Sequence, residues 1–171
     1  EDAVTLRRGA RLRTAALEVY HEAAREKVRH DELSRQFDRA LDNMFIAYQP
    51  IVSWSRLEVV AYEALLRTSE PATPNPGSFL AVAESLGRLP EVGRAVRALV
   101  AKALAGLPAE LSMFVNLHPA DLADPALYAP DSPLSAYASR VVLEVTERES
   151  LSGFADVAGN VAALRALGYR L

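Results

Sequence analysis

The sequence predicts an α/β fold: part of a (β/α) barrel that contains one antiparallel strand and is preceded by a long N-terminal helix. Three observations lead to this fold class. The first 43 residues are rich in helix formers, two closely connected apolar runs follow, and further apolar runs then alternate with helical segments. Strands that alternate with helices are typical of parallel sheets, and four to five strands fit half of a barrel better than a finished open sheet.

The segment from Val4 to about Asn43 contains no proline and one glycine, which predicts one long helix or two. An interrupted apolar stripe runs along this segment. It consists of Leu12, Ala16, Val19 and Ala23 and then, after a charged interval, of Leu33, Phe37, Leu41 and Met44. Such a stripe fits a helix that packs on its own domain, or a signalling helix that dimerises and links to an upstream sensor. We take residues 1–43 as this linker or signalling helix and residues 44–171 as the incomplete barrel.

Two strands are predicted next, over about 45–52 and 57–66, because both runs are rich in β-branched and aromatic residues. Their connection is too short for a helical crossover, so they should form an antiparallel hairpin. A proline-rich loop over 68–76 then leads into two helices, at about 76–87 and 90–107.

Short apolar runs at 113–117 and 141–145 predict two buried strands. A last helix is expected over about 154–167 and ends at Gly168. The final three residues, 169–171, then have the character of a strand that has just begun.

The bulk composition indicates a soluble globular unit, since half of the 171 residues are apolar and the net charge is −3. There is no cysteine, so a metal must be held by oxygen or imidazole ligands. No Lys/Arg blocks favour nucleic acid, and no run is long enough to span a membrane. The acidic start, Glu1-Asp2, is unlike a secretory signal, so we expect a cytoplasmic segment. Because the chain opens without an initiator methionine, we expect its polypeptide to extend upstream.

Three polar side chains interrupt apolar strand sequences: Glu63, Asn116 and Glu144. A buried carboxylate is costly unless it is paired or bound to a cation. Taken singly, a glutamate in a strand more often faces solvent or pairs with an arginine. Taken together, two glutamates and an amide that converge from neighbouring strands predict an oxygen-lined site for Mg²⁺ or Mn²⁺.

Three further polar residues each leave two interpretations open. Arg67 shares a strand face with Glu63, where it fits a phosphate clamp or a salt bridge to Glu63 or Glu70. His118 fits a metal ligand or substrate contact, or a cap at the end of a strand. Gln49 could bind a base edge or bond to the backbone.

Four ordered motifs carry a resemblance to a known family. They read Tyr48-Gln49-Pro50-Ile51-Val52, Tyr62-Glu63-Ala64-Leu65-Leu66-Arg67, Phe114-Val115-Asn116-Leu117-His118-Pro119 and Leu143-Glu144-Val145-Thr146-Glu147-Arg148. In this order and spacing they resemble the opening motifs of the EAL domain, from about Phe45 to the end of the chain. Four ordered motifs are far more specific than the tripeptide Glu63-Ala64-Leu65 alone.

The resemblance implies a TIM-like barrel with one antiparallel strand and an active site at the C-terminal ends of the strands. It also implies a metal-dependent phosphodiesterase that hydrolyses cyclic di-GMP to linear pGpG. The residues that match the family's metal ligands and catalytic positions are Glu63, Asn116 and Glu144. Those that match substrate-binding positions are Leu65, Arg67 and, more weakly, Gln49.

The family pattern continues past Leu171 with a paired-aspartate motif, a lysine and a further glutamate, so we expect the parent protein, not this chain alone, to turn over substrate. Thr146 and Glu147 would support the site from its rim. The alternative is a non-catalytic cyclic-di-GMP receptor or a dimerising signalling module. The expected partners are cyclic di-GMP, a second copy in a homodimer, and an upstream sensor domain in the same chain.

Overall fold

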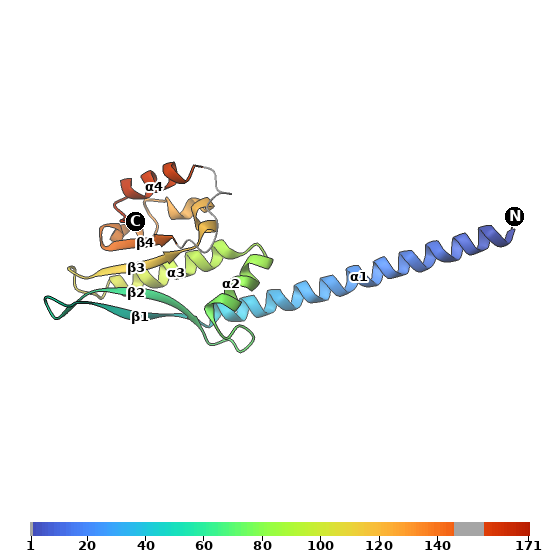
Figure 1. Cartoon of the computed structure of the whole chain (residues 1–171), viewed down its shortest axis with the longest axis horizontal. Helices are drawn as coiled ribbons and strands as arrows, with labels where there is room; N and C mark the ends of the chain where they lie inside the picture. Colours follow the sequence, from blue (N-terminus) through green and yellow to red (C-terminus); the bar gives the residue numbers. More distant parts are fainter. Residues whose placement is uncertain (1, 146–155) are drawn as a thin grey trace.

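A single helix, α1 (Asp2–Asp42), projects from the rest of the molecule (Figure 1). The structure is a computed structural model that describes residues 2–145 and 156–171. At 1.5 Å per residue, the 41 residues of α1 span about 60 Å. The helix ends where the Asn43 side chain donates a hydrogen bond of 2.8 Å to the carbonyl of Arg39. The sequence predicted either one long helix or two for this segment, and the structure has one.

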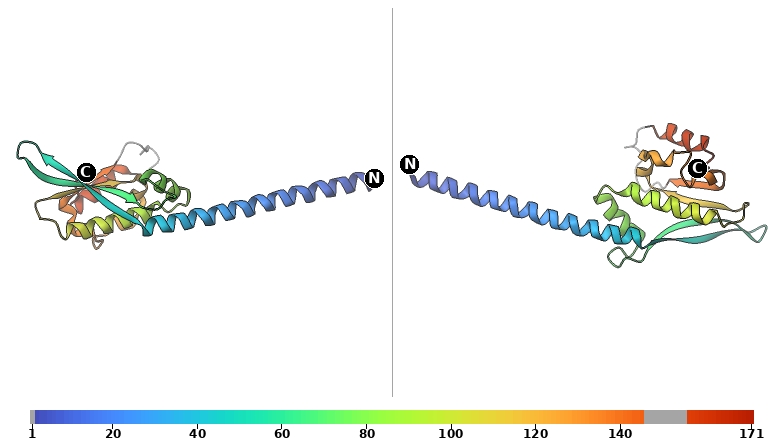
Figure 2. Two further views of the ribbon diagram at one scale, coloured as in Figure 1. Left: turned by 90° about the horizontal axis from the view of Figure 1, so that it is seen from below. Right: turned by 180° about the vertical axis from the view of Figure 1, so that it is seen from behind.

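The hairpin is formed by β1 (Met44–Ser53) and β2 (Glu58–Thr68), which pair antiparallel over their whole length. Their register shifts between Ile51 and Val52, where a bulge increases the twist. Leu57 takes a left-handed conformation in the turn, with φ of 51°. The hairpin extends beyond the rest of the sheet at the end opposite to α1 (Figure 2).

The parallel part of the sheet adds β3 (Ser112–Leu117) and β4 (Val141–Val145), giving the order β1-β2-β3-β4. Helices α2 (Pro76–Ser85) and α3 (Leu89–Leu104) make the crossover from β2 to β3. Three short 3₁₀ helices, η1 (Pro119–Ala123), η2 (Pro125–Leu127) and η3 (Ser135–Arg140), connect β3 to β4.

The chain ends with α4 (Val157–Ala166) and a strand that has just begun. Arg170 forms a parallel bridge with Val142, with hydrogen bonds to its two neighbours in β4. The expected strand at 169–171 is therefore present as a single bridge. Together with the antiparallel hairpin and the parallel β2–β3–β4 order, this confirms the predicted α/β fold class.

The main core lies between one face of the sheet and α3. Ala64, Val115 and Leu143 come from three adjacent strands and are buried on this face. Val100 and Leu104 of α3 belong to the same buried cluster. Because side chains alternate across a strand, the residues between these positions lie on the opposite face of the sheet.

A second core cluster fixes the end of α1 to the body. Phe37 and Ala40 are fully buried against Phe79 and Ala83 of α2 and Val92 of α3. The rings of Phe37 and Phe79 lie with their centroids 5.6 Å apart. The last turns of α1 thus pack with α2 and α3, while the division of the chain at residue 43 stays a prediction.

The element bounds differ from the expected ones by a few residues at helix ends. Helix α2 ends at Ser85, two residues before Gly87, which has φ of 66°. Helix α3 ends at Leu104 rather than Leu107, because a turn follows its last residues. The start expected for the last helix, near 154, lies outside the described residues. None of the described helices combines the length and apolar character that crossing a membrane requires.

Candidate functional site

Glu63, Asn116 and Glu144 lie on one face of three adjacent strands. Asn116 and Glu144 are direct register partners in the parallel pair β3–β4. Glu63 is the register partner of Phe114, and Phe114 and Asn116 are two residues apart, so they share a face. The sheet therefore brings together the three residues that the sequence singled out.

A hydrogen bond links two of these side chains directly. The amide Nδ2 of Asn116 donates to Oε1 of Glu63 at 3.0 Å. Because this nitrogen is turned to Glu63, the amide oxygen is turned away from it and remains a candidate ligand. Asn116 is exposed, whereas Glu63 and Glu144 are partly buried.

The residues expected to bind substrate continue the same face. Leu65 and Arg67 follow Glu63 at two-residue intervals along β2, and Gln49 of β1 is the register partner of Glu63. Arg67 donates from its guanidinium to the carbonyl of Leu66 at 2.8 Å. The sheet face thus carries the predicted cation ligands and the predicted substrate contacts side by side.

Contacts decide two of the alternatives that the sequence left open. Glu70 pairs with Arg39 of α1 at 3.3 Å, and Arg67 forms no ion pair within the described part of the chain. His118 caps η1, because its Nδ1 accepts a hydrogen bond of 3.1 Å from the backbone of Ala120. His118 therefore acts as a cap at the start of η1, directly after β3, while the salt bridge considered for Arg67 is not formed.

A cavity of about 250 Å³ lies at the C-terminal ends of β2 and β3. Its sheet wall is formed by Ala64, Leu66, Val115 and Leu117, which face the helices, and it reaches Leu65, Arg67 and Asn116 at the ends of the strands. Its apolar walls are formed from the helical side by Leu80, Leu89, Val92 and Val96. Small-molecule sites are mostly apolar hollows with a few convergent polar groups, typically of about 300–1,000 Å³. This cavity is smaller than that range and lies on the helical side of the sheet, whereas Glu63, Asn116 and Glu144 share the opposite face.

A buried ion-pair network, which the sequence reasoning missed, fixes the wall of this cavity. Arg97 donates to Asp121 at 2.8 Å and to Asp124 at 2.6 Å, and all three side chains are buried. Asp121 also accepts a hydrogen bond of 3.2 Å from the backbone of His118. Burial raises the pKa of the Asp121 carboxyl, and the nearby charge of Arg97 opposes that shift.

One sequence signal could have revealed this network. Arg97 stands three, four and seven residues before Val100, Ala101 and Leu104, which are buried on the inner face of α3. An arginine in phase with a core stripe needs a buried acidic partner, because an unpaired buried charge is very costly.

The donor set of the site fits a hard divalent cation. Two carboxylates and one amide oxygen are the ligand types that Mg²⁺ and Mn²⁺ prefer. Within residues 2–145 and 156–171, no group of three or more His, Asp or Glu side chains is placed to hold a metal ion. A cation here would thus combine Glu63 and Glu144 with the neutral amide of Asn116. Thr146 and Glu147, expected at the rim, lie outside the described residues.

Comparison with known families decides the assignment. The EAL domain model matches residues 30–171, which is most of the chain. This chain belongs to the EAL domain family. An uncharacterised signalling protein of Caulobacter vibrioides is 29% identical to this EAL chain over 136 residues, which are 76% of this chain and 17% of that protein.

Solved EAL structures share the fold of this EAL chain. The EAL domain of Xanthomonas citri FimX, in complex with cyclic di-GMP, has a TM-score of 0.67 and 23% identity over 85% of this chain and 61% of its own. The PaMucR phosphodiesterase, also in complex with cyclic di-GMP, has a TM-score of 0.63 and 28% identity over 81% of this chain and 61% of its own.

A third relative contains a divalent cation. Klebsiella pneumoniae BlrP1, as a complex with manganese and cyclic di-GMP, has a TM-score of 0.58 and 26% identity over 74% of this chain and 33% of its own. This EAL chain thus spans 61% or less of each of the three solved chains.

Proposed function

We propose that this EAL chain forms part of the active site of a cyclic-di-GMP phosphodiesterase, in which Glu63, Asn116 and Glu144 hold Mg²⁺ or Mn²⁺. One observation carries the proposal: the three side chains share one face of adjacent strands, with Asn116 bonded to Glu63 and in register with Glu144. Oxygen ligands on rigid strands are suited to fixing a cation in one geometry.

The reaction is the hydrolysis of one phosphodiester bond to give linear pGpG. Water adds to phosphorus, the bond from phosphorus to the ribose oxygen breaks, and that oxygen takes a proton. A divalent cation supplies such a site with an activated water and with charge neutralisation at the phosphate oxygens.

The residues of this chain hold the nucleotide for that reaction. Arg67 donates hydrogen bonds to a phosphate oxygen, since it lies near the C-terminal end of β2 on the same strand face as Glu63 and carries a planar guanidinium. Leu65 packs against the ligand, because it follows Glu63 by two residues on the same face of β2. Gln49, opposite Glu63 in the hairpin, contributes a weaker polar contact. These roles place binding and chemistry on neighbouring positions of one sheet face.

The relatives support this proposal at the level of the family. PaMucR, 28% identical, is a phosphodiesterase seen with cyclic di-GMP. BlrP1 is seen with cyclic di-GMP and either calcium or manganese, at 27% and 26% identity. We carry the ligand and the kind of cation over to this chain as proposals.

A cyclic-di-GMP receptor without catalysis is the second candidate. BlrP1 also forms a complex with FMN and cyclic di-GMP that contains no metal ions. Nucleotide binding in that relative is therefore separable from cation binding, and the residues of this chain could serve binding alone. An upstream sensor domain in the same polypeptide remains a prediction.

A titration with cyclic di-GMP tests the binding roles, which the two candidates share. The 171-residue chain is titrated by calorimetry, and Arg67→Ala should weaken binding about tenfold or more, since it removes charged hydrogen bonds. Arg56→Ala is the matched control, because Arg56 lies at the other end of the hairpin and pairs with Glu58. Equal affinities for the two variants would refute the role of Arg67.

Chromatography of the products completes the test. The longest natural polypeptide that contains this chain is incubated with cyclic di-GMP and Mn²⁺ or Mg²⁺. Linear pGpG that forms only with the cation supports the phosphodiesterase. Tight binding without any linear product would contradict it and favour the receptor.

A further inference from the structure

The C-terminal end of β3 carries Asn116, and the backbone pairing of β3 with β2 stops short of this residue. The last backbone pair between the two strands joins Ala64 to Val115. Pairing with β4 continues as far as Leu117. Towards β2, Asn116 is held by its side-chain bond to Glu63. Because the ends of strands are the parts of a sheet that open most easily, the position of Asn116 depends on what holds the chain just beyond it.

Asp121 holds the chain directly beyond β3. One oxygen of its carboxylate, Oδ2, accepts a hydrogen bond of 3.2 Å from the backbone N–H of His118. The carbonyl of His118 accepts a bond of 2.8 Å from the backbone of Asp121 in return. His118 follows the last residue of β3 and lies two residues after Asn116. The carboxylate of Asp121 therefore fixes the point at which β3 turns into η1.

Arg97 of α3 fixes this carboxylate in turn. Its Nη1 donates to the other oxygen of Asp121, Oδ1, at 2.8 Å, and its Nη2 donates to Asp124 at 2.6 Å. The planar guanidinium sets the directions of both bonds, so the two carboxylates are held in one arrangement. Gly93, one turn earlier in α3, leaves room for Asp121, because a Cβ at this position would overlap the carboxylate. An unbroken series of bonds thus connects α3 to the end of β3.

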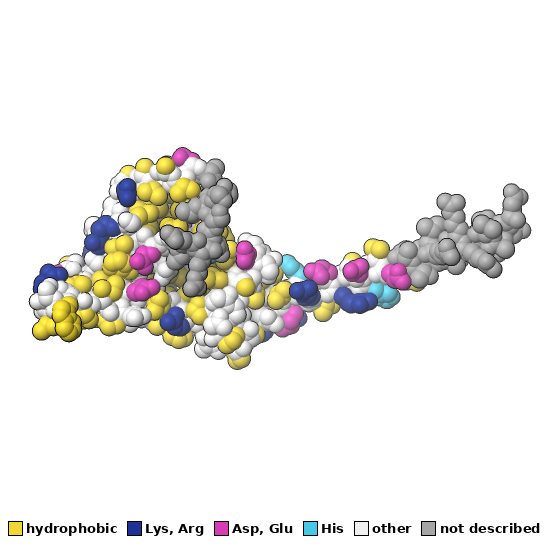
Figure 3. Space-filling view, viewed as in Figure 1, with side chains coloured by type: hydrophobic (Ala, Val, Ile, Leu, Met, Phe, Trp, Pro, Cys, Tyr) yellow, Lys and Arg dark blue, Asp and Glu magenta, His cyan; other side chains and the backbone are white. Residues whose placement is uncertain are grey.

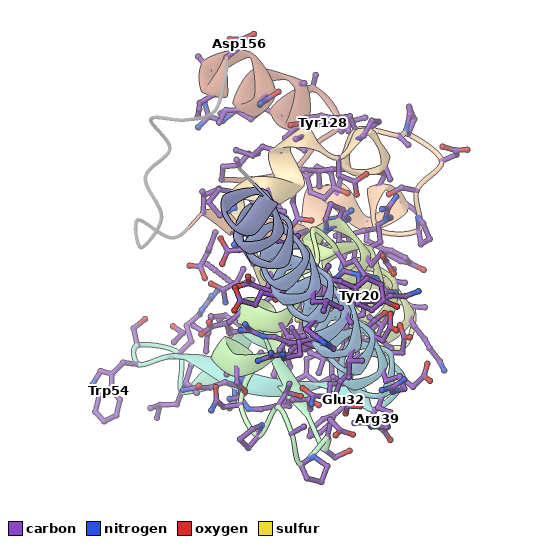
Figure 4. The ribbon with its side chains drawn as sticks, turned by 90° about the vertical axis from the view of Figure 1, so that its right-hand side faces the viewer. Tyr20, Glu32, Arg39, Trp54, Tyr128 and Asp156 are labelled. Atoms are coloured by element: carbon purple, nitrogen blue, oxygen red, sulfur yellow. The ribbon has the colours of Figure 1, made fainter. Side chains whose placement is uncertain are left out.

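Burial distinguishes this network from the other ion pairs of the chain. Acidic and basic side chains alternate along the projecting part of α1 (Figure 3). Glu32 and Arg39, which lie close together on α1 (Figure 4), are each 48% exposed and 4.0 Å apart. Exposed pairs of this kind fix little. The side chains of Arg97, Asp121 and Asp124 are only 7%, 5% and 3% exposed, so solvent does not compete for their bonds.

We propose that Arg97 and Asp121 are positioning residues of the cation site. Through the backbone of His118 they hold the end of β3, so that Asn116 keeps its amide oxygen directed at the cation. The inference rests on the proposed function, since it assigns both residues a role at that site. Neither residue touches the cation, because both line the cavity on the helical side of the sheet.

The choice of charged residues supports this role. Replacing a buried ion pair by apolar side chains of similar size is often neutral or even stabilising, so stability alone does not explain why Arg97 and Asp121 are charged. An apolar side chain in place of Asp121 would have no acceptor for the backbone N–H of His118. The feature that the charged pair adds is therefore the anchor at the end of β3.

Nuclear magnetic resonance of the 171-residue chain tests the positioning without any cation. The readout is the side-chain NH₂ signal of Asn116, which is identified by its absence in Asn116→Asp. In Asp121→Ala, Arg97 keeps its bond to Asp124, so it is not left unpaired, while His118 loses its acceptor. We expect the Asn116 signal of this variant to move toward that of a free side-chain amide.

Met113→Val is the matched control for the NMR experiment. Met113 is fully buried at the other end of β3, so this variant loses core packing but keeps the anchor. Its Asn116 signal should stay where it is in the wild type. An unchanged Asn116 signal in Asp121→Ala, or an equal change in Met113→Val, would overturn the inference.

Binding of Mn²⁺, followed by electron paramagnetic resonance, gives a second readout that a merely structural role would not move. Asp121→Ala should weaken binding by the folded chain about tenfold, as is typical for residues that orient a ligand. Arg97→Lys should weaken it less, because it keeps the charge and loses the planar fork. Met113→Val should bind like the wild type.

The two readouts separate this inference from the proposed function. A wild type that binds Mn²⁺ no better than Asp121→Ala and Arg97→Lys do would overturn the positioning role. A wild type that binds no Mn²⁺ at all would contradict the proposed function, and the Asn116 signal would still decide whether Asp121 holds the end of β3.

Discussion

The side-chain amide of Asn116 donates a hydrogen bond of 3.0 Å to Glu63 across the boundary between β3 and β2. This bond lies on an exposed part of the sheet, so it contributes little to folding. We expect Asn116→Ala to change the free energy of unfolding by less than about 1 kcal/mol, as measured with urea. A larger loss would show that Asn116 is mainly a structural residue.

Arg88 connects the end of α1 to α3. Its guanidinium stacks 4.0 Å from the centroid of the Phe37 ring and donates to Asp38 at 2.8 Å and to Glu91 at 2.7 Å. We expect Arg88→Ala to lower the free energy of unfolding by about 1–2 kcal/mol, because it removes a cation–π contact and two partly exposed ion pairs. Urea denaturation measures this.

Arg35→Ala is the control for that substitution. Arg35 pairs with Glu32 on the exposed surface of the same helix, so its removal should leave the unfolding midpoint unchanged. If Arg35→Ala and Arg88→Ala lowered the unfolding midpoint equally, the stacking of Arg88 on Phe37 would contribute nothing to the free energy of unfolding.

The pair of Arg88 and Glu91 also predicts a dependence on pH. The hydrogen bond from Arg88 holds the pKa of Glu91 below its usual range. A lowered folded-state pKa stabilises the fold above the unfolded value of about 4.3, and this contribution is lost as the pH falls through the folded-state pKa. We therefore expect the stability difference between wild type and Glu91→Gln to shrink as the pH falls below about 4.3. If the stability difference between wild type and Glu91→Gln stayed constant until Glu91 was fully protonated, the lowered pKa of Glu91 would be contradicted.

Gly93 allows η1 to approach α3. A Cβ atom built at this position would overlap the carboxylate of Asp121, which Arg97 holds in place. We expect Gly93→Ala to destabilise the fold by about 1–3 kcal/mol in thermal or urea unfolding, although alanine is the better helix former. Gly106→Ala is the control, because the nearest atom to its Cβ would be 3.8 Å away. Equal stability of the two variants would contradict the close approach.

Sequence alone predicted the sheet and the candidate site because both depend on local periodicity. Asn116 lies between the apolar Val115 and Leu117, and Glu144 follows the apolar Leu143, so both alternate away from the buried face of the sheet. The Arg97–Asp121 pair was missed because it joins residues 24 positions apart with no shared period. Which side of α1 packs on the body also needed the structure, since an apolar stripe does not state whether Phe37 meets its own domain or another chain.

The central claim is that Glu63, Asn116 and Glu144 together hold a divalent cation. Electron paramagnetic resonance of Mn²⁺ added to the 171-residue chain measures this directly, through loss of the free-ion signal. We predict that Glu144→Gln weakens Mn²⁺ binding about tenfold or more. Glu58→Gln, at the opposite end of β2, should leave it unchanged. Wild-type protein that bound no Mn²⁺, or bound it equally well after Glu144→Gln, would contradict the account.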